Sequence, residues 1–365
     1  MKFSGNTQEI MEGLSAVTHA LSAKPAKPVF DGVHVQCDGT TLSLTCSDGT
    51  MSIRWTGSAT VTEPGEAIIK GKLFADLMRK LSSTTAKITA DERAATITYN
   101  KSRSQLAVIA GTYPEIREIT NPAVFTIPAL AMKDMITHIL PAIAVENPRI
   151  ILTGGVLDVT PEGITVVSLD GFRLALKRYR HDTGISGNIR AIIPRKTLLE
   201  MSRILPSSDD PVTIHLGQDA IRADIGSTTI TSTLLSGEYV DYGKIIPTTF
   251  LTRIRADVRS LGDTLDRVSM FAREGKTNLV QFSIHDNTLA VSSQSDTSNI
   301  AEELDCDQEG NNLAISFNSS YISDAIRTVP DDYISMNFNS SSSPVVISPV
   351  NNTDWLFLIL PVRTH

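Results

Sequence analysis

The amino-acid sequence predicts an α+β protein made of three repeated domains, each with an antiparallel sheet and two helices. The first observation is an internal repeat: the segments IIKGKLFADLMRKL, IIPRKTLLEMSRIL and ISFNSSYISDAIRTV align at steps of about 124 residues. In that alignment Phe74, Leu198 and Ile322 share one apolar position. The second observation is that much of the remaining chain alternates polar and apolar residues, as half-buried strands do.

Each repeat contains two predicted helices, because apolar residues recur there at three- and four-residue steps. One helix lies in the repeated segments just described. The other precedes it by roughly 60 residues, after a short strand, at 7–22, 130–143 and 258–271. The sequences CDGT, PEG and HDN are typical of hairpin turns, so antiparallel strand pairs fill the rest of each repeat.

Breaks in this pattern predict the domain boundaries. The sequences NP at 121–122 and PTT at 247–249 interrupt the alternation. The predicted domains are therefore residues 1–124, 125–249 and 250–365, each of a size typical for a single domain.

The composition is that of an ordinary soluble globular protein, with 41% apolar and 20% charged residues. The three cysteines, Cys37, Cys46 and Cys306, are widely separated, and none forms a CxxC pair. That usage argues against a disulfide framework or a thiolate zinc site and is typical of a reducing compartment. The sequence shows no signal peptide and no apolar run of about 20 residues, so we expect a cytoplasmic protein.

Basic residues gather on the predicted helices although the whole chain carries a net charge of −7. Lys70, Lys72 and Arg79 belong to the second helix of the first repeat, and Arg195 and Lys196 belong to its counterpart in the second. Recurrence on equivalent elements indicates a basic surface. Because no aromatic residues are interleaved with these cations, such a surface would meet phosphates without reading bases.

The familiar sequence signatures of catalysis do not occur. The seven histidines stand singly, without HExxH or other metal-ligand spacing, and GxSxG, GxxxxGK[ST] and GxGxxG are missing from the sequence. In the stretch SLDGFRLAL, at 168–176, Asp170 offers a carboxylate with no second acid or base fixed beside it. We expect this stretch to be a strand in which Gly171 relieves strain at a bulge or bend. The sequence predicts no catalytic residue, no metal site and no cofactor.

Three motifs resemble those of one family. SLDGFRLAL at 168–176, GEYVDYGKIIP at 237–247 and LILPVR at 358–363 are similar to signature stretches of the bacterial DNA polymerase III beta subunit, the beta sliding clamp. IIPRKTLLEM, FNSSYISDAI and AKPVFDGVHVQ resemble the same family. Each motif alone is weak, but their order and spacing are specific, and the resemblance covers the whole chain.

The resemblance implies the DNA clamp fold and a head-to-tail homodimer, in which six domains close into a ring with helices lining the hole. Such a ring encloses double-stranded DNA without sequence specificity and serves replication as a processivity factor. It is a non-catalytic accessory subunit. The implied partners are the DNA polymerase III alpha subunit, the clamp loader, other DNA polymerases and repair proteins, all binding through short peptide motifs.

The resemblance also implies a hydrophobic peptide-binding pocket between the second and third domains. Apolar walls would hold an aromatic or leucine anchor, and a few polar groups would orient it. Carried over position by position, the pocket residues are Leu152, Leu169, Gly171, Phe172, Arg173, Leu174, Val240, Ile245, Asn318, Tyr321, Leu358, Leu360, Pro361, Val362 and Arg363.

Two further sets of residues follow from the same resemblance. The residues expected to face DNA are Lys24, Lys72, Lys101, Arg103, Arg149, Arg195 and Lys196. A two-fold ring needs two unlike surfaces that complement each other. The residues expected at that dimer interface are Tyr113 and Pro114 from the first domain and Met270 and Phe271 from the third.

Four features of this sequence depart from the family pattern. Phe172 stands where the family usually has histidine, Leu169 where threonine is common, and Val240 where proline is usual. The tail also runs on to residues 364–365. We therefore expect the position of the pocket to be kept while its preferred peptide differs.

Two other classes of function stay open on the sequence. One is a DNA-processing enzyme built on a repeated α+β scaffold, which turnover or a metal requirement would favour. The other is a repeat-built peptide-binding adaptor that does not encircle DNA, which a stable monomer would favour.

Overall fold

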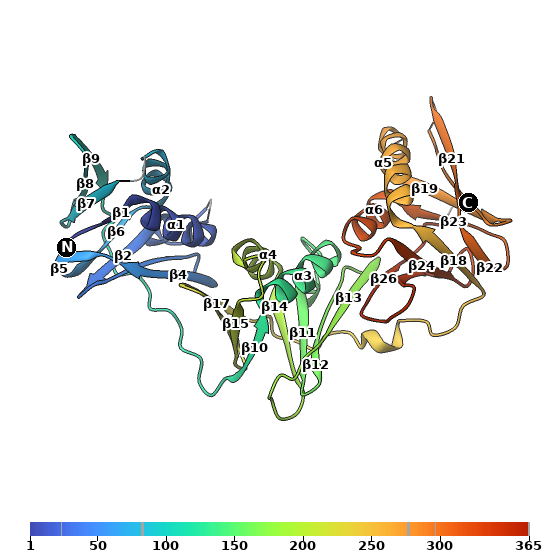
Figure 1. The fold of residues 1–365 in the computed structure, drawn as a ribbon, viewed down its shortest axis with the longest axis horizontal. Helices are drawn as coiled ribbons and strands as arrows, with labels where there is room; N and C mark the ends of the chain where they lie inside the picture. The colour runs from blue at the N-terminus through green and yellow to red at the C-terminus, as the bar shows by residue number, and fades with distance from the viewer. Residues whose placement is uncertain (23, 82–83, 276–277, 296, 364–365) are drawn as a thin grey trace. The chain divides into compact units, whose positions relative to one another are not determined.

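The computed structural model describes residues 1–22, 24–81, 84–275, 278–295 and 297–363. The chain forms two compact units, one of Met1–Lys133 with Glu200–Leu234 and the other of Asp134–Leu199 with Leu235–His365. Each unit contains two sheets, and every strand pair recorded among the described residues is antiparallel (Figure 1). The predicted antiparallel sheets are thus confirmed.

The first unit holds a five-stranded and an eight-stranded sheet. The five-stranded sheet has the order β5 (Thr60–Glu63), β1 (Lys2–Asn6), β7 (Thr85–Ala90), β8 (Ala94–Tyr99) and β9 (Ser102–Ala107). The eight-stranded sheet has the order β10 (Ala123–Pro128), β15 (Pro211–Leu216), β16 (Ala220–Ile225), β17 (Thr228–Thr233), β4 (Met51–Ser58), β3 (Thr41–Ser47), β2 (Gly32–Asp38) and β6 (Gly65–Lys70).

Two helices, α1 (Thr7–Val17) and α2 (Gly71–Lys80), lie side by side in the first unit (Figure 1). The Asn6 side chain caps α1 by accepting the backbone N–H of Gln8 at 2.8 Å. Helix α1 approaches the sheet closely at Gly13, where an added Cβ would lie 2.5 Å from the Trp55 ring. Glycine at this position therefore allows the helix to pack directly on the aromatic ring.

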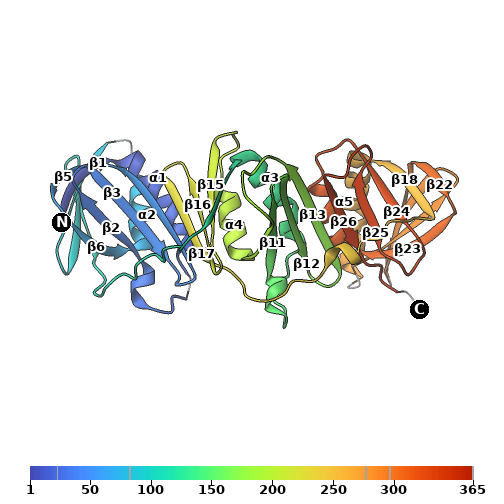
Figure 2. The ribbon, with the colours of Figure 1, turned by 90° about the horizontal axis from the view of Figure 1, so that it is seen from below.

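The second unit holds a nine-stranded and a four-stranded sheet. The nine-stranded sheet has the order β14 (Ile189–Pro194), β11 (Gly154–Thr160), β12 (Gly163–Leu169), β13 (Arg173–Arg180), β26 (Trp355–Ile359), β25 (Val345–Pro349), β24 (Tyr333–Phe338), β18 (Thr252–Asp257) and β22 (Asp307–Gly310) (Figure 2). The four-stranded sheet has the order β21 (Asn299–Asp305), β20 (Thr288–Gln294), β19 (Leu279–His285) and β23 (Leu313–Asn318).

The helices of the second unit repeat the arrangement of the first. Helices α5 (Val258–Glu274) and α6 (Ser319–Arg327) pack against each other, and Asp257 caps α5 by accepting the Ser260 N–H at 2.7 Å. Two more helices, α3 (Ala129–Ile139) and α4 (Arg195–Ile204), each run across the limit between the units. Short 3₁₀ helices are η1 (Thr18–Ala20), η2 (Pro28–Asp31), η3 (Leu140–Ala142), η4 (Ile150–Thr153) and η5 (Tyr242–Lys244).

All six predicted helices are confirmed, with small differences at their ends. Helix α1 ends at Val17 and continues as the 3₁₀ helix η1, and α5 extends three residues beyond Phe271. The three short strands predicted before the first helices are β1, β10 and β18. Each of these strands leads directly into the helix that follows, as the repeat predicts.

The prediction for 168–176 was wrong in one respect. The stretch is not a single strand, because β12 ends at Leu169, residues 170–172 form a turn, and β13 begins at Arg173. Gly171 has φ +100°, a conformation that glycine adopts without strain, so it serves a turn rather than a bulge.

Two strand pairs join parts of the chain that are distant in sequence. Strand β4 pairs with β17, with Thr228 opposite Trp55, and β13 pairs with β26, with Arg173 opposite Ile359. We call these the first and second seams. Each seam makes one continuous sheet across a predicted domain boundary. The two edge strands hydrogen-bond to each other, so their backbone N–H and C=O groups need no water as a partner.

Two remaining expectations concern the cysteines and the helices. Cys37, Cys46 and Cys306 are all buried thiols, and Cys46 packs on β3 as a small apolar group. Burial raises the pKa of the Cys46 thiol, so this group is unreactive. Among the helices that the structure describes, none is both long and apolar enough to span a membrane.

Candidate functional site

The turn between β12 and β13 is the centre of the candidate site. The Asp170 carboxylate accepts the backbone N–H of Phe172 at 2.9 Å and that of Arg173 at 3.0 Å through its Oδ1 atom. This is the local geometry by which aspartate stabilises a tight turn, and Gly171 supplies the positive φ. The backbone carrying Phe172 and Arg173 is therefore held rigidly.

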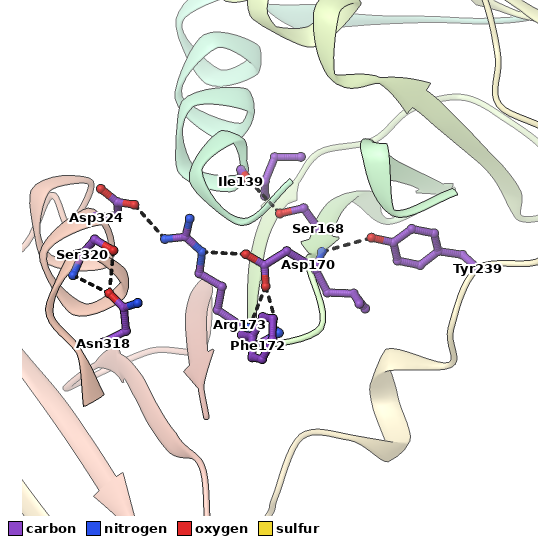
Figure 3. A network of polar contacts seen from close by, with 10 residues as sticks. Ile139, Ser168, Asp170, Phe172, Arg173, Tyr239, Asn318, Ser320 and Asp324 are labelled. Atoms are coloured by element: carbon purple, nitrogen blue, oxygen red, sulfur yellow. Dashed lines mark hydrogen bonds and ion pairs between the residues drawn. The ribbon is translucent and has the colours of Figure 1, made fainter. Parts of the chain in front are cut away.

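Arg173 connects this turn to helix α6. Its Nε donates to Asp170 Oδ2 at 3.0 Å, and its Nη1 donates to Asp324 Oδ2 at 2.7 Å (Figure 3). The guanidinium also lies over the Tyr321 ring, 4.3 Å from its centroid. Because the Arg173 side chain is only 13% exposed, these two ion pairs are partly shielded from water. Arg173 is thus a structural link whose charge is already neutralised.

Phe172 presents an apolar ring beside this link. Its side chain is 60% exposed, and its ring lies nearly parallel to Tyr321 at a centroid distance of 6.3 Å. An exposed phenylalanine on a rigid turn is a suitable anchor for a partner, because little conformational entropy is lost when it is covered.

The C-terminal tail places two more exposed apolar side chains, Leu360 and Val362, beside Phe172. We call these three residues the apolar rim. The Leu360 N–H donates to the Phe172 carbonyl at 2.9 Å, and the Val362 N–H donates to the Ser316 carbonyl at 2.8 Å. The tail therefore lies between the turn and strand β23. The Leu360 and Val362 side chains remain exposed.

A buried apolar cluster lies on the strands next to the turn. Its members include Leu152, Leu169, Leu174 and Leu358, and Val240 packs against it. The backbone N–H of Leu169 donates to the Tyr239 hydroxyl at 3.1 Å (Figure 3). Burial raises the pKa of the Tyr239 phenol, which therefore stays neutral. These leucines form the base of the site and not its exposed surface.

The segment that covers the cluster is fixed by a second polar network. The Tyr242 hydroxyl donates to Asp158 Oδ2 at 2.6 Å, and Arg190 binds the same carboxylate through Nε and Nη2 at 2.6 and 2.9 Å. Burial and the bond to Asp158 raise the pKa of Tyr242 to about 12. The 235–250 segment is thereby held against the nine-stranded sheet.

The structure brings most of the predicted pocket residues together. Leu152, Leu169, Leu174, Leu358 and Val240 share the buried cluster. Five others lie at or beside the turn and tail, joined by the contacts described above: Gly171, Phe172, Arg173, Leu360 and Tyr321.

The remaining predicted pocket residues lie around that group. Asn318 caps helix α6, because its side chain accepts the Ser320 N–H at 3.0 Å. Ile245 is exposed just after η5, and Pro361 and Arg363 flank Val362 in the tail, half-buried and exposed respectively. Residues 364–365 of the tail lie outside the described residues.

The predicted DNA-facing residues are mostly on the surface. Only Arg195 is half-buried, and the exposed ones are Lys24, Lys72, Lys101, Arg103, Arg149 and Lys196. Lys72 lies in α2 and Arg195 and Lys196 begin α4, as expected, whereas Arg103 lies on strand β9 and its Nη2 donates to Thr96 at 3.4 Å.

The predicted interface residues divide into exposed and buried ones. Met270 on α5 is 58% exposed and Pro114 is exposed, whereas Phe271 is half-buried. Tyr113 is only 7% exposed, because its ring stacks on His34 at 4.8 Å within the first unit. Tyr113 therefore offers little surface to a second subunit.

Sequence reasoning missed the polar residues that hold the site in place. Asp324 pairs with Arg173 across 151 residues, and Tyr239 supports Leu169 across 70. Asp76, Glu200 and Asp324 occupy one position of the three-fold repeat, and this shared acid was the only signal for Asp324. Over the residues that the structure describes, no three His, Cys, Asp or Glu side chains gather closely enough to hold a metal ion.

Comparison with known protein families identifies the fold. Three family models match the chain in tandem: the N-terminal domain of the DNA polymerase III beta subunit at residues 1–117, its central domain at 126–241 and its C-terminal domain at 243–363. The chain belongs to the DNA polymerase III beta subunit family. This confirms the predicted resemblance and the α+β clamp fold of three domains.

Individual relatives support the same assignment. The beta sliding clamps of Staphylococcus aureus and Staphylococcus epidermidis are each 26% identical to this chain over 377 residues, covering all of both proteins. Among solved structures, the DNA polymerase sliding clamp of Bacillus subtilis has a TM-score of 0.95 at 27% identity. The DNA polymerase III subunit beta of Pseudomonas aeruginosa has a TM-score of 0.95 at 25% identity, and both structures are covered completely.

Proposed function

We propose that this protein is a DNA sliding clamp, a processivity factor that encircles duplex DNA and tethers the replicative polymerase. The observation that carries the proposal is the tandem match of all three beta subunit domains along residues 1–363. A single clamp domain would allow many functions, but three in this order, with full-length relatives named as clamps, favour the clamp over the adaptor or enzyme.

The charge distribution supports contact with DNA. The six α-helices, all within the described residues, carry eleven Lys and Arg against nine Asp and Glu, whereas the whole chain carries 33 against 40. The helices are thus positive on a negative protein. A positive helix surface meets phosphates without sequence specificity. We assign contact with phosphates to Lys72, Arg195 and Lys196 on these helices, and to Lys24, Lys101, Arg103 and Arg149 outside them.

Closure into a ring requires a second copy of the chain. Strand β9 ends the five-stranded sheet and carries Arg103, whereas β21 ends the four-stranded sheet and carries Glu303 and Asp305. Two unlike edges of opposite charge suit a head-to-tail homodimer, because each edge can pair with the other type on a partner. Met270 and Phe271 from α5, with Pro114, would add apolar contacts at this interface. Tyr113 is buried against His34, so it would hold the neighbouring Pro114 in place without touching the partner itself.

Partners would dock at the β12–β13 turn. The apolar rim of Phe172, Leu360 and Val362 lies next to strands whose leucines are buried, and exposed apolar groups of this kind suit contact with an apolar peptide anchor. We assign peptide motifs of the DNA polymerase III alpha subunit, the clamp loader, other DNA polymerases and repair proteins to this site. The clamp itself would catalyse no reaction and would work in the cytoplasm on replicating DNA.

The domain boundaries are part of the same proposal. The family models end and begin at 117 and 126 and at 241 and 243, close to the limits of the proposed domains of residues 1–124, 125–249 and 250–365. The two compact units divide the chain differently, because the seams join neighbouring domains through continuous sheets.

Primer extension on a long single-stranded circle tests the proposal. With the cognate polymerase and clamp loader, adding this protein should lengthen the products made in a single binding event, and sedimentation should give the mass of a dimer. Unchanged product length would overturn the clamp function. A protein that sediments only as a monomer would overturn the ring.

A further inference from the structure

The second unit contains a hollow beside the buried cluster of the candidate site, and none of the predicted pocket residues lines it. It has a volume of about 470 Å³ and lies where the 235–250 segment ends on the nine-stranded sheet. Its apolar walls include Ile246, Pro247, Phe250, Val350 and Leu356. Its floor carries Arg253 and Asn337. The volume falls within the range of roughly 300–1,000 Å³ typical of small-ligand sites.

Strand register explains why the floor is polar. On β18, Ile254 and Ala256 are buried, so Arg253 and Arg255 face the other side of the sheet. The pairing places Arg253 between Glu309 of β22 and Asn337 of β24, and Asn337 in turn opposite Val346. The side chains that lie side by side across these strands therefore change from charged, at Glu309 and Arg253, to apolar, at Val346.

A hydrogen bond to a buried network orients the Arg253 side chain, which is itself exposed. Its Nε donates to Asn337 Oδ1 at 2.9 Å, Ser335 donates to the same oxygen at 3.1 Å, and Asn337 Nδ2 donates to the Val346 carbonyl at 3.1 Å. Asn337 is only 5% exposed. A buried amide is unfavourable unless it is fully bonded, and here its bonds orient the guanidinium at the floor of the hollow.

Arg255 and Arg253 lie on the same face of β18 but differ in their ion pairs. Arg255 forms an ion pair with Asp307 at 3.1 Å and lies 3.8 Å from the centroid of the Tyr333 ring. Within the described part of the chain, Arg253 forms no ion pair with a carboxylate, although Glu309 stands opposite it in register. Its Nη1 and Nη2 atoms, which make the fork that binds carboxylates, are therefore left for another group.

We infer that this hollow binds a small apolar carboxylate, with the carboxylate on the Arg253 guanidinium and the apolar group between Phe250, Val350 and Leu356. The fixed fork supplies two parallel hydrogen bonds to a planar anion. The apolar walls favour a hydrocarbon or aromatic body of about the size of one amino-acid side chain. Glu309 is the competing acid, so it weakens binding and favours a ligand that adds apolar contact to its charge.

N-acetyl-phenylalanine is a direct probe, and its neutral amide and inorganic phosphate are the matched comparisons. Calorimetric titration of the full chain should show saturable binding of the acid, with the amide at least about tenfold weaker. Phosphate should bind weakly, because it lacks an apolar group. Arg253→Gln should lower the affinity for the acid about tenfold or more, and Glu309→Gln should raise it.

Arg259→Gln is the control variant, because Arg259 is an exposed arginine of α5 outside the hollow and should leave binding unchanged. Equal binding of the acid and its amide, or the same loss in Arg253→Gln and Arg259→Gln, would overturn the inference. No saturable binding of the acid at millimolar concentration would also overturn it. Primer extension with Arg253→Gln should give the same product length as with the unsubstituted protein. The binding test at the hollow can therefore fail while the clamp proposal stands, and the reverse also holds.

Discussion

Two turns of the molecule share one backbone design and differ in what they display. In the β3–β4 turn, Asp48 Oδ1 accepts the N–H groups of Thr50 and Met51, both at 2.8 Å, and Gly49 has φ +95°. Asp170 and Gly171 make the same turn before β13. We call them the first and second turns.

Each turn also meets the far strand of its seam in the same way. The Thr233 N–H donates to the Thr50 carbonyl at 3.0 Å, as the Leu360 N–H does to the Phe172 carbonyl at 2.9 Å. In the repeat, the sequence SQSDT at 293–297 is the third counterpart of these two turns, and its Asp296 lies outside the described residues.

The side chains at matching positions set the two turns apart. Thr50 of the first turn corresponds to Phe172 of the second, and buried Met51 corresponds to the ion-paired Arg173. The backbone of the turn thus belongs to the domain repeat, whereas the capacity to bind a partner comes from two substituted positions and the tail beside them. Exchanging residues between the turns tests that division.

Placing an arginine in the first turn should lower the free energy of unfolding more than any other exchange between the turns. Met51 is 1% exposed, so Met51→Arg forces a guanidinium into an apolar interior. We expect the free energy of unfolding to fall by about 4 kcal/mol or more, measured by urea denaturation. The volume-conserving control Met51→Leu should lower it by less than about 1.5 kcal/mol. Equal effects of the two substitutions would contradict the distinction between the turns.

The reverse exchange should have a smaller effect. Arg173→Met leaves the Asp170 carboxylate, 14% exposed, without its cation, and separates the turn from Asp324. We expect a loss of about 2–3 kcal/mol, below the value for a fully buried pair because water reaches Asp324. Adding Asp170→Asn should recover part of the loss, because the amide keeps the oxygen that accepts both backbone N–H groups. No recovery would mean that the loss comes from packing rather than from the unpaired charge.

The second seam should also respond to acid. His138 at the end of α3 is buried, with its ring 4.2 Å from that of Phe357, and burial together with nearby Lys177 lowers its pKa to about 3. The unfolded chain then binds the extra proton at any pH between about 3 and 6.5. The free energy of unfolding should therefore fall by about 2 kcal/mol from pH 7 to pH 5 through this residue.

Urea denaturation at both pH values, on the protein and on His138→Phe, measures that contribution. The substitution should remove this part of the acid sensitivity. An unchanged pH dependence in His138→Phe would show that His138 is not the group responsible.

The smallest expected energy change is the most informative for function. Phe172→Thr makes the second turn like the first, and because the ring is 60% exposed it should change stability by less than about 0.5 kcal/mol. Affinity for a peptide from the polymerase III alpha subunit, measured by fluorescence anisotropy, should fall about tenfold. Thr50→Phe is the matched control, because the first turn lacks the exposed tail. A loss of affinity in Thr50→Phe, or none in Phe172→Thr, would contradict the account.

The elements that the sequence predicted correctly are those that depend on residues close together in the chain. The six helices follow from apolar spacing within single segments, and the repeat places them in order. The turn at 170–172 was mistaken for a strand because apolar residues continue on both sides of Asp170 and Gly171. The Asp-Gly pair that this stretch shares with residues 48–49 was the signal for a turn.

The contacts that fix the site could not be predicted in the same way. The partners of Arg173 and Leu169 are 151 and 70 residues away, and the register that puts Arg253 beside Asn337 joins strands 84 residues apart. Such pairings depend on which strands become neighbours in a sheet, and no short-range pattern records that choice. Tyr113 illustrates the same point, because its burial against His34 follows from the packing of the first unit.

The most direct test of the clamp function is retention on circular and linear DNA. After loading by the clamp loader, the protein should remain on a closed circle through gel filtration and should be lost when a restriction enzyme opens that circle. Enclosure predicts this difference, because a ring that contacts phosphates without sequence specificity can slide off a free end. Blocking both ends of the linear DNA with bound protein should restore retention. Equal retention on the closed and the cut DNA would contradict the central claim.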